Sequence, residues 1–146
     1  MGGVSFKMDM TKMTKGLDLA MSKIASPQEL MDAVGETLVS STLQRFQDGV
    51  DPDGKKWKTS QRADKEGGQT LVDSAILRDS ITYEASPQMV CIGSNEIYAR
   101  IHQLGGKAGR GLKVTIPKRS YLGINDEDKT EIKALMMEEL KTMFGA

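Results

Sequence analysis

Two residues of this chain belong to the types that carry nucleophilic catalysis: its single cysteine, Cys91, and its single histidine, His102. An imidazole can activate a thiol for attack on acyl groups when a third polar group orients the ring. Cys91 lies in an apolar run predicted as a strand, and His102 falls on a predicted helix, with no evident Asp or Asn to orient it. The pattern therefore favours a buried cysteine and a packed or capping histidine over a hydrolase.

Metal-ligating residues are equally sparse. A zinc site draws on several histidines, cysteines or carboxylates at close spacing, and neither His-x-x-x-His nor Glu-x-x-His occurs. One cysteine excludes an intramolecular disulfide and a cysteine cluster around a metal within one chain. We expect no catalytic residue, no metal ion and no cofactor.

The glycine-rich segment 105–111 reads Gly-Gly-Lys-Ala-Gly-Arg-Gly and invites comparison with phosphate-binding loops. Glycines let backbone N–H groups approach phosphate oxygens. However, the pattern Gly-x-x-x-x-Gly-Lys-Ser/Thr is absent, and the segment leads into a predicted strand where a phosphate cradle leads into a helix. Three roles stay open: a mobile connection, a loop that orders against a partner, and a loop that meets nucleic-acid phosphate.

The same segment lies in a stretch without acidic residues between Ile97 and Asn125. Such loops, repeated around a ring, would contact DNA without sequence preference, or would dock on an acidic patch such as residues 126–128 of a neighbouring copy. Trp57 either anchors its polar loop to the long helix, the favoured reading, or contacts a partner. The residues predicted to contact a subunit, a partner or DNA are Arg100, Lys107, Arg110, Lys113, Lys118, Arg119, Tyr121 and Trp57.

Length and charge limit the class of protein. The chain has 146 residues, which suits one domain over residues 1–146, and its 20 basic residues match its 20 acidic ones. This balance argues against a protein that coats nucleic acid or a membrane surface. No apolar stretch approaches the roughly 20 residues that span a bilayer, and the N-terminus does not resemble a signal peptide.

Apolar periodicity predicts the helices that must position these residues. A helix is expected over residues 11–23. Ser26, as N-cap, and Pro27 then open a long helix with Leu30, Val34, Leu38, Thr42 and Phe46 on one face, which Asp48-Gly49 ends. A second long helix starts at Asn125-Asp-Glu-Asp128, whose acids suit a helix N-terminus, and carries the row Ile132, Met136, Leu140 and Phe144.

Strands and turns are predicted between the helices. Residues 4–10 alternate as a strand, residues 80–85 and 88–93 form a hairpin, and residues 112–117 form a strand ended by Pro117. Short helices are expected at 71–79 and from Asn95 to Leu104, and flexible loops at 55–69 and 105–111. The predicted fold class is α+β: a small antiparallel sheet packed by two long helices, with a mobile glycine-rich basic loop.

Four motifs, in order and with fitting spacing, resemble the phage virion morphogenesis family. They are Asp51-Pro-Asp-Gly-Lys-Lys-Trp57 after a helix ending in Arg45-Phe46, Leu77-Arg-Asp-Ser-Ile81, Gly93-Ser-Asn-Glu-Ile-Tyr-Ala-Arg-Ile-His-Gln-Leu-Gly-Gly106 and Ile116-Pro-Lys-Arg-Ser-Tyr-Leu-Gly123. The match runs from about residue 40 to the last helix. Family members usually carry Ala, Pro and Phe at the positions of Lys118, Ser120 and Tyr121.

The resemblance implies a structural subunit that completes the tail of a tailed phage and joins it to the head connector. It implies a ring, a hexamer, around the DNA channel at the neck of the virion, in contact with tail-tube and head-connector proteins, made in the host cytoplasm. The family has no known catalytic residue. The alternative is a small nucleic-acid-binding protein that uses the basic residues 100–119.

Overall fold

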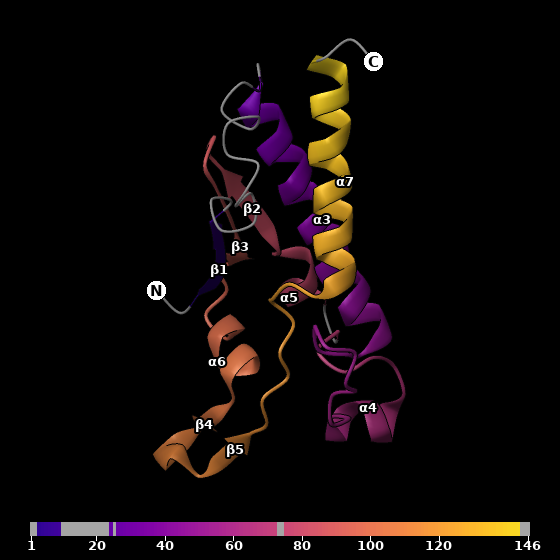
Figure 1. Cartoon of the computed structure of the whole chain (residues 1–146). Helices are drawn as coiled ribbons and strands as arrows, with labels where there is room; N and C mark the ends of the chain where they lie inside the picture. The colour runs from indigo at the N-terminus through magenta and orange to yellow at the C-terminus, as the bar shows by residue number, and fades with distance from the viewer. Residues whose placement is uncertain (1–2, 10–23, 25, 73–74, 144–146) are drawn as a thin grey trace.

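The computed structural model describes residues 3–9, 24, 26–72 and 75–143 (Figure 1). The helix predicted at 11–23 lies outside these residues. The described elements are, in chain order, β1 (Val4–Asp9), α3 (Pro27–Asp48), α4 (Gln61–Glu66), α5 (Ile76–Asp79), β2 (Thr82–Ala85), β3 (Met89–Ser94), α6 (Ala99–Leu104), β4 (Gly106–Ala108), the 3₁₀ turn η1 (Arg110–Leu112), β5 (Val114–Ile116) and α7 (Asp126–Met143).

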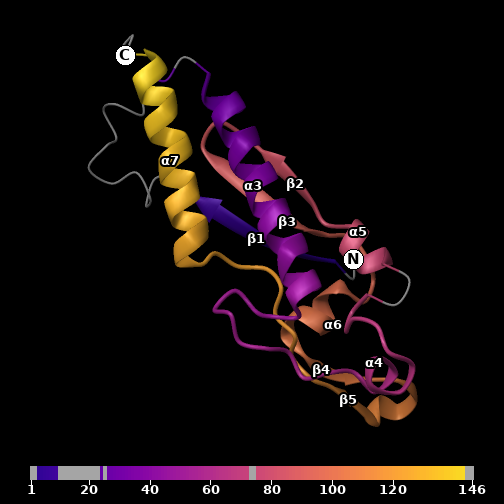
Figure 2. The ribbon, with the colours of Figure 1, turned by 90° about the vertical axis from the view of Figure 1, so that its right-hand side faces the viewer.

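A three-stranded antiparallel sheet in the order β1-β3-β2 forms one layer. In its register Ile92 of β3 lies opposite Phe6 of β1 and Tyr83 of β2, so the predicted hairpin at 80–93 is confirmed. Helix α3 packs on β2 and β3, and α7 packs along α3 (Figures 1 and 2). The α+β fold class is therefore confirmed.

The core lies between the sheet and the two long helices. Alternate residues of β3, Val90 and Ile92, are buried, as strand geometry requires when one face is covered. The predicted apolar rows of α3 and α7 supply the other side with the buried residues Leu30, Val34, Leu38, Phe46, Ile132, Met136 and Leu140. Phe144, expected on the second row, lies outside the described residues.

Helix α3 begins and ends where the sequence predicts. Pro27 occupies its first turn, and Gly49 follows its last residue in the left-handed conformation with φ 67°, donating its N–H to the carbonyl of Arg45 at 2.7 Å. The predicted capping by Ser26 is wrong in one respect, because its hydroxyl makes no cap hydrogen bond. Midway along the helix, Gly35 leaves room for the ring of Tyr83: a Cβ there would lie 2.3 Å from Cδ2 of that ring.

The segment 55–69, predicted as a loop, contains helix α4. Ser60 caps it, with Oγ accepting from the Ala63 N–H at 3.2 Å, a start signal that the prediction passed over among many polar residues. Trp57, just before it, is buried with its ring edge-on to Phe46 at 5.6 Å. Its Nε1–H donates to the Ser120 carbonyl at 2.8 Å. Trp57 thus anchors this segment, as the favoured interpretation had it.

The region around α6 differs most from prediction. Helix α6 begins at Ala99 and not near Asn95, and its preceding residue Tyr98 makes no side-chain cap bond. Beyond it, β4 pairs antiparallel with β5, so the segment 105–111 is partly strand and not a loop throughout. Gly105 leaves α6 with φ 73°, and a Cβ there would lie 2.9 Å from the Lys118 nitrogen, so only glycine allows this close approach of the two backbones.

Candidate assembly surface

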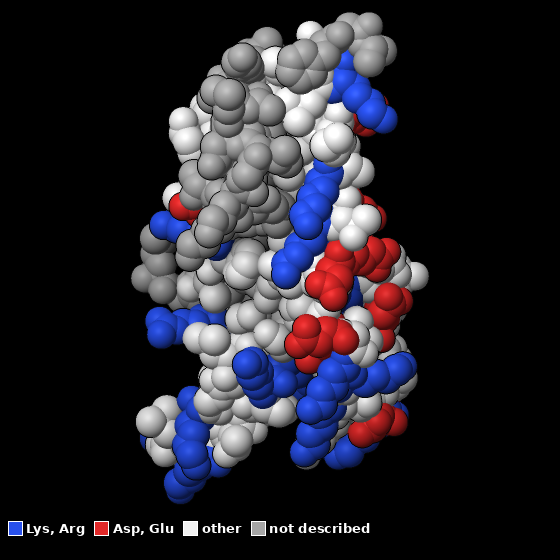
Figure 3. All heavy atoms as spheres, viewed as in Figure 1, with Lys and Arg blue, Asp and Glu red and all other residues white. Residues whose placement is uncertain are grey.

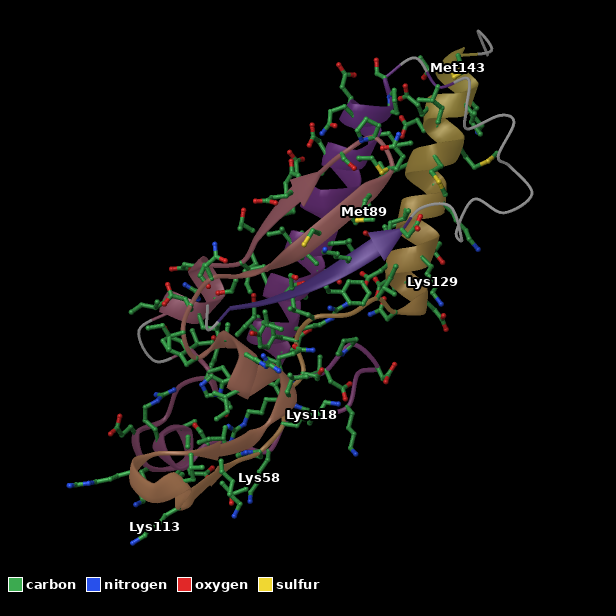
Figure 4. The ribbon with its side chains drawn as sticks, turned by 90° about the vertical axis from the view of Figure 1, so that its left-hand side faces the viewer. Lys58, Met89, Lys113, Lys118, Lys129 and Met143 are labelled. Atoms are coloured by element: carbon green, nitrogen blue, oxygen red, sulfur yellow. The ribbon has the colours of Figure 1, made fainter. Side chains whose placement is uncertain are left out.

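Residues 104–118, called the arm below, comprise β4, η1 and β5 with their flanks. The arm extends from α6 away from the sheet and the two long helices (Figures 1 and 4). In its register Lys107 lies opposite Thr115 and Ala108 opposite Val114. Because opposite residues share a face of a ribbon and successive residues alternate, one face is polar and the other, with Ile116, is apolar.

Most of the predicted cations lie exposed on or next to the arm. Figure 4 shows Lys113 at its far end and Lys118 nearer its base. In the space-filling view basic side chains dominate the lower end of the molecule (Figure 3). No ion pair within the described part of the chain engages the exposed cations, which are Arg100, Lys107, Arg110, Lys113 and Lys118.

The same end of the molecule exposes large apolar side chains. Ile97, before α6, is 84% exposed, and Leu112, at the end of the arm, is 62% exposed. Leu112 also has a φ of 55°, a left-handed conformation that costs a leucine about 1–2 kcal/mol. Tyr98, Leu104 and Val114 are exposed as well. Large apolar side chains exposed along α6 and the arm favour a surface that contacts another macromolecule.

Three of the predicted interaction residues lie inside the protein and contact its own backbone. Arg119 donates from Nε to the Lys58 carbonyl at 2.7 Å, and Trp57 is the anchor described above. Tyr121 is fully buried against Phe46, with ring centroids 5.1 Å apart, and donates its hydroxyl to the Ala99 carbonyl at 2.6 Å. Desolvation by burial raises the pKa of Tyr121 well above its ordinary value. The candidate surface therefore excludes these three side chains.

Gln103 fixes the base of the arm, and sequence reasoning missed it. Its Oε1 accepts from the backbone N–H groups of Tyr121 and Leu122, both at 2.9 Å. Its Nε2 donates to the Ser120 hydroxyl at 2.9 Å and to the Leu122 carbonyl at 3.2 Å. One side chain thus replaces a strand as the hydrogen-bonding partner of the returning chain. A glutamine on a short helix gives no local signal of this role.

A second feature of the surface is a groove between α3, α7 and the turn at residues 50–54. It has a volume of about 1080 Å³, and eight of its lining residues are acidic whereas two, Arg45 and Lys129, are basic. In Figure 3 acidic side chains gather beside the start of α7. Within the described residues no ion pair engages the groove carboxylates Glu36, Asp53, Asp126, Glu127 and Glu131.

The acidic patch expected at residues 126–128 is smaller than predicted. Asp126 and Glu127 are exposed, but Asp128 is buried and pairs with Arg45 of α3 at 2.5 Å. Asp128 also accepts from the N–H of Asn125 at 3.1 Å, while Asn125 Oδ1 accepts from the N–H of Asp128 at 2.7 Å, a reciprocal cap that starts α7. Asp128 thus serves the fold, and the rest of the groove supplies the free carboxylates.

The residues considered for catalysis are not assembled into a site. No hydrogen bond joins Cys91 of β3 to His102 of α6, both of which the structure describes. Burial, followed by the charge of Arg119, lowers the pKa of His102, and its Nδ1 is buried without a hydrogen-bond partner. Within the described ranges no three His, Cys, Asp or Glu residues are grouped to hold a metal ion. None of the described helices is long and apolar enough to cross a membrane.

Comparison with known proteins identifies relatives of this chain and the family to which it belongs. A protein of Haemophilus influenzae named "Mu-like prophage FluMu G protein 2" is 37% identical over 133 residues, 91% of this chain and 89% of the relative. A protein of Escherichia phage Mu named "Putative capsid assembly protein G" is 28% identical over 142 residues, 88% of this chain and 91% of the relative. No solved structure matches. Residues 8–141 match the phage virion morphogenesis family, and the chain belongs to that family.

Proposed function

We propose that this protein is a structural subunit that completes the tail of a phage particle and joins it to the head connector, forming a ring around the DNA channel. The observation that carries the proposal is the arm, whose exposed cations form no ion pair within the described residues and whose Leu104, Leu112 and Val114 are exposed. In a monomer these apolar side chains stay in contact with water, whereas a subunit of an assembly buries them against a neighbour.

The names of the relatives fit this role. The relative from Escherichia phage Mu is named for capsid assembly, and the relative from Haemophilus influenzae is named as a prophage protein. A subunit at the junction between head and tail would serve capsid assembly and tail completion together. We propose a hexameric ring at the neck, in contact with tail-tube and head-connector proteins.

Phage particles made without this protein test the proposal. Electron microscopy of lysates from a deletion of its gene should show filled heads and separate tails, and the gene supplied in trans should restore joined particles. A tagged copy should be labelled at the neck of restored particles. Normally joined particles from the deletion, or a tag absent from purified virions, would contradict the proposal.

A second candidate is a small nucleic-acid-binding protein, favoured by the exposed cations around Lys107, Lys113 and Lys118. Binding through phosphates falls steeply with salt, because each neutralised phosphate releases counterions. Titration of double-stranded DNA at several salt concentrations measures this directly. Binding without a salt slope, or no binding, would exclude this candidate and leave the structural role.

A further inference from the structure

The arm has features that contact with a partner would stabilise. A two-stranded ribbon on its own is marginal in water, and its apolar face carries Val114, which is half exposed. At its end Leu112 combines an unfavourable φ with a largely exposed side chain. Strained residues of this kind cluster at functional sites, and an exposed apolar side chain at such a position suits contact with another surface.

The mixture of apolar and basic side chains on the arm favours a protein over DNA as its partner. Phosphate contacts draw on Lys, Arg and polar groups, which the arm has, but they make no use of exposed Leu104, Leu112 and Val114. A surface that mixes apolar anchors with cations is typical of protein interfaces, where charge at the rim fixes the register of the partners. The partner should therefore combine carboxylates with some apolar surface.

The groove between α3 and α7 has this composition. Its unpaired carboxylates are joined by the apolar side chains of Ile124 and Leu135, which are half-buried in its lining. Small-molecule pockets are mostly apolar and enclosed, unlike this open acidic groove. No residue of the arm lines the groove, and the arm points away from α7, so the arm of one molecule does not occupy its own groove (Figure 1).

We infer that the arm of one copy binds in the α3–α7 groove of a second copy. Leu112 and Val114 pack beside Ile124 and Leu135, and the arm cations lie beside the carboxylates of the groove. Since the two surfaces differ, the contact is head-to-tail, and its repetition gives a closed ring when the rotation between copies closes. The inference rests on the proposed function, because it names the interface that would build the ring.

Charge reversal on the two surfaces tests the inference with the full chain. An arm variant carries Lys107→Glu and Arg110→Glu, and a groove variant carries Glu36→Lys and Glu131→Lys. Each should self-associate at least tenfold more weakly than the unaltered protein in sedimentation velocity at low salt, about 1.4 kcal/mol per contact. A 1:1 mixture of the two, and a chain with all four changes, should recover association because opposite charges face each other again.

The matched control, Lys133→Glu with Lys141→Glu, alters exposed lysines of α7 outside the groove and should associate normally.

A cysteine pair locates the contact independently of its strength. Leu112→Cys with Leu135→Cys in one chain should give a ladder of disulfide-linked oligomers on oxidation, whereas Leu112→Cys with Met137→Cys, an exposed position outside the groove, should not. Undiminished association of the arm variant alone and of the groove variant alone, or a chain that stays monomeric and gives no ladder, would overturn the inference. Loss of DNA binding in the arm variant with unchanged association would overturn it in favour of DNA. Labelling of the neck in purified particles tests the proposed function separately. Its result does not depend on whether the arm forms the contact between copies.

Discussion

Arg45 and Asp128, 83 positions apart in the chain, form a buried ion pair that joins α3 to the start of α7. Nη2 of Arg45 lies 2.5 Å from Oδ2 of Asp128, and the two side chains are 4% and 3% exposed. Nη1 of Arg45 also donates to the carbonyls of Tyr121 and Gly123, and Ser41 donates its hydroxyl to Asp128 Oδ1 at 2.6 Å. This network holds the floor of the acidic groove in place.

Removing one partner of this pair should destabilise the protein strongly. We expect Asp128→Ala to lower the free energy of unfolding by about 3–5 kcal/mol, because it leaves the guanidinium of Arg45 buried without its carboxylate. Urea denaturation measures the change. The control is Asp79→Ala at the exposed Arg78–Asp79 pair, where the expected loss is at most about 1 kcal/mol. Equal losses at the two positions would show that the buried pair does not anchor α7.

Gln103→Ala should loosen the base of the arm. The backbone N–H groups of Tyr121 and Leu122 would lose their acceptor, with an expected cost of about 2–4 kcal/mol for the two. Urea denaturation measures the loss, and amide hydrogen exchange should show lower protection at these two residues. Gln44→Ala, which removes an exposed glutamine bonded to Asp48, is the matched control and should change stability by under about 0.5 kcal/mol. Unchanged protection at Tyr121 would contradict the clamp.

Gly35→Ala should destabilise the protein although alanine favours helix. The new Cβ would meet the Tyr83 ring, and overpacking of this kind costs about 1–3 kcal/mol, more than the roughly 1 kcal/mol that alanine gains in a helix. In a Tyr83→Ala background the sign should reverse, and Gly35→Ala should then stabilise. Thermal and urea denaturation of the four proteins of this cycle give the coupling. Additive effects would show that Gly35 and Tyr83 do not meet.

Tyr121 should make stability fall in alkaline solution. Its pKa is raised in the folded state from 10.0, because burial penalises the phenolate, while the unfolded chain keeps the ordinary value. The contribution is therefore complete below pH 10 and is lost as pH rises toward the folded pKa, with a slope of at most about 1.4 kcal/mol per pH unit. Tyr121→Phe should be less stable at neutral pH by about 1 kcal/mol, through the lost bond to Ala99, and should lack this slope. Parallel pH profiles for the two proteins would contradict the assignment.

Lys107→Glu with Arg110→Glu should leave the fold intact while it impairs particle assembly. Both side chains are exposed and without an ion-pair partner among the described residues, so the two changes together should alter the free energy of unfolding by under about 1 kcal/mol. Thermal denaturation checks stability, and complementation of a gene deletion checks assembly. A large drop in melting temperature would show instead that the cations support the structure of the arm.

Particular elements show how far the sequence predicts this fold. Helix α3 follows from Pro27 at its start, Gly49 at its end and an apolar residue at every fourth position between them. The hairpin of β2 and β3 follows from two alternating runs around Ser86-Pro87. These signals lie within one element and its ends, where propensity and periodicity act. The acid-free run with its glycines likewise indicates an exposed basic segment, and Lys107, Arg110 and Lys113 are exposed.

Only the tertiary structure decided the roles that depend on contacts between residues far apart in the chain. Asp128 reads as one of three acids at a helix start, yet it is buried because α3 brings Arg45 to it. Arg119 belongs by sequence to a basic surface segment, yet it turns inward onto the carbonyl of Lys58, and nearby Tyr121 donates its buried hydroxyl to the carbonyl of Ala99. The strand β4 exists because β5 returns beside it, and the groove exists because α7 packs along α3. Burial and pairing of this kind depend on which elements meet in space, and neither local propensity nor periodicity in the sequence indicates which elements meet.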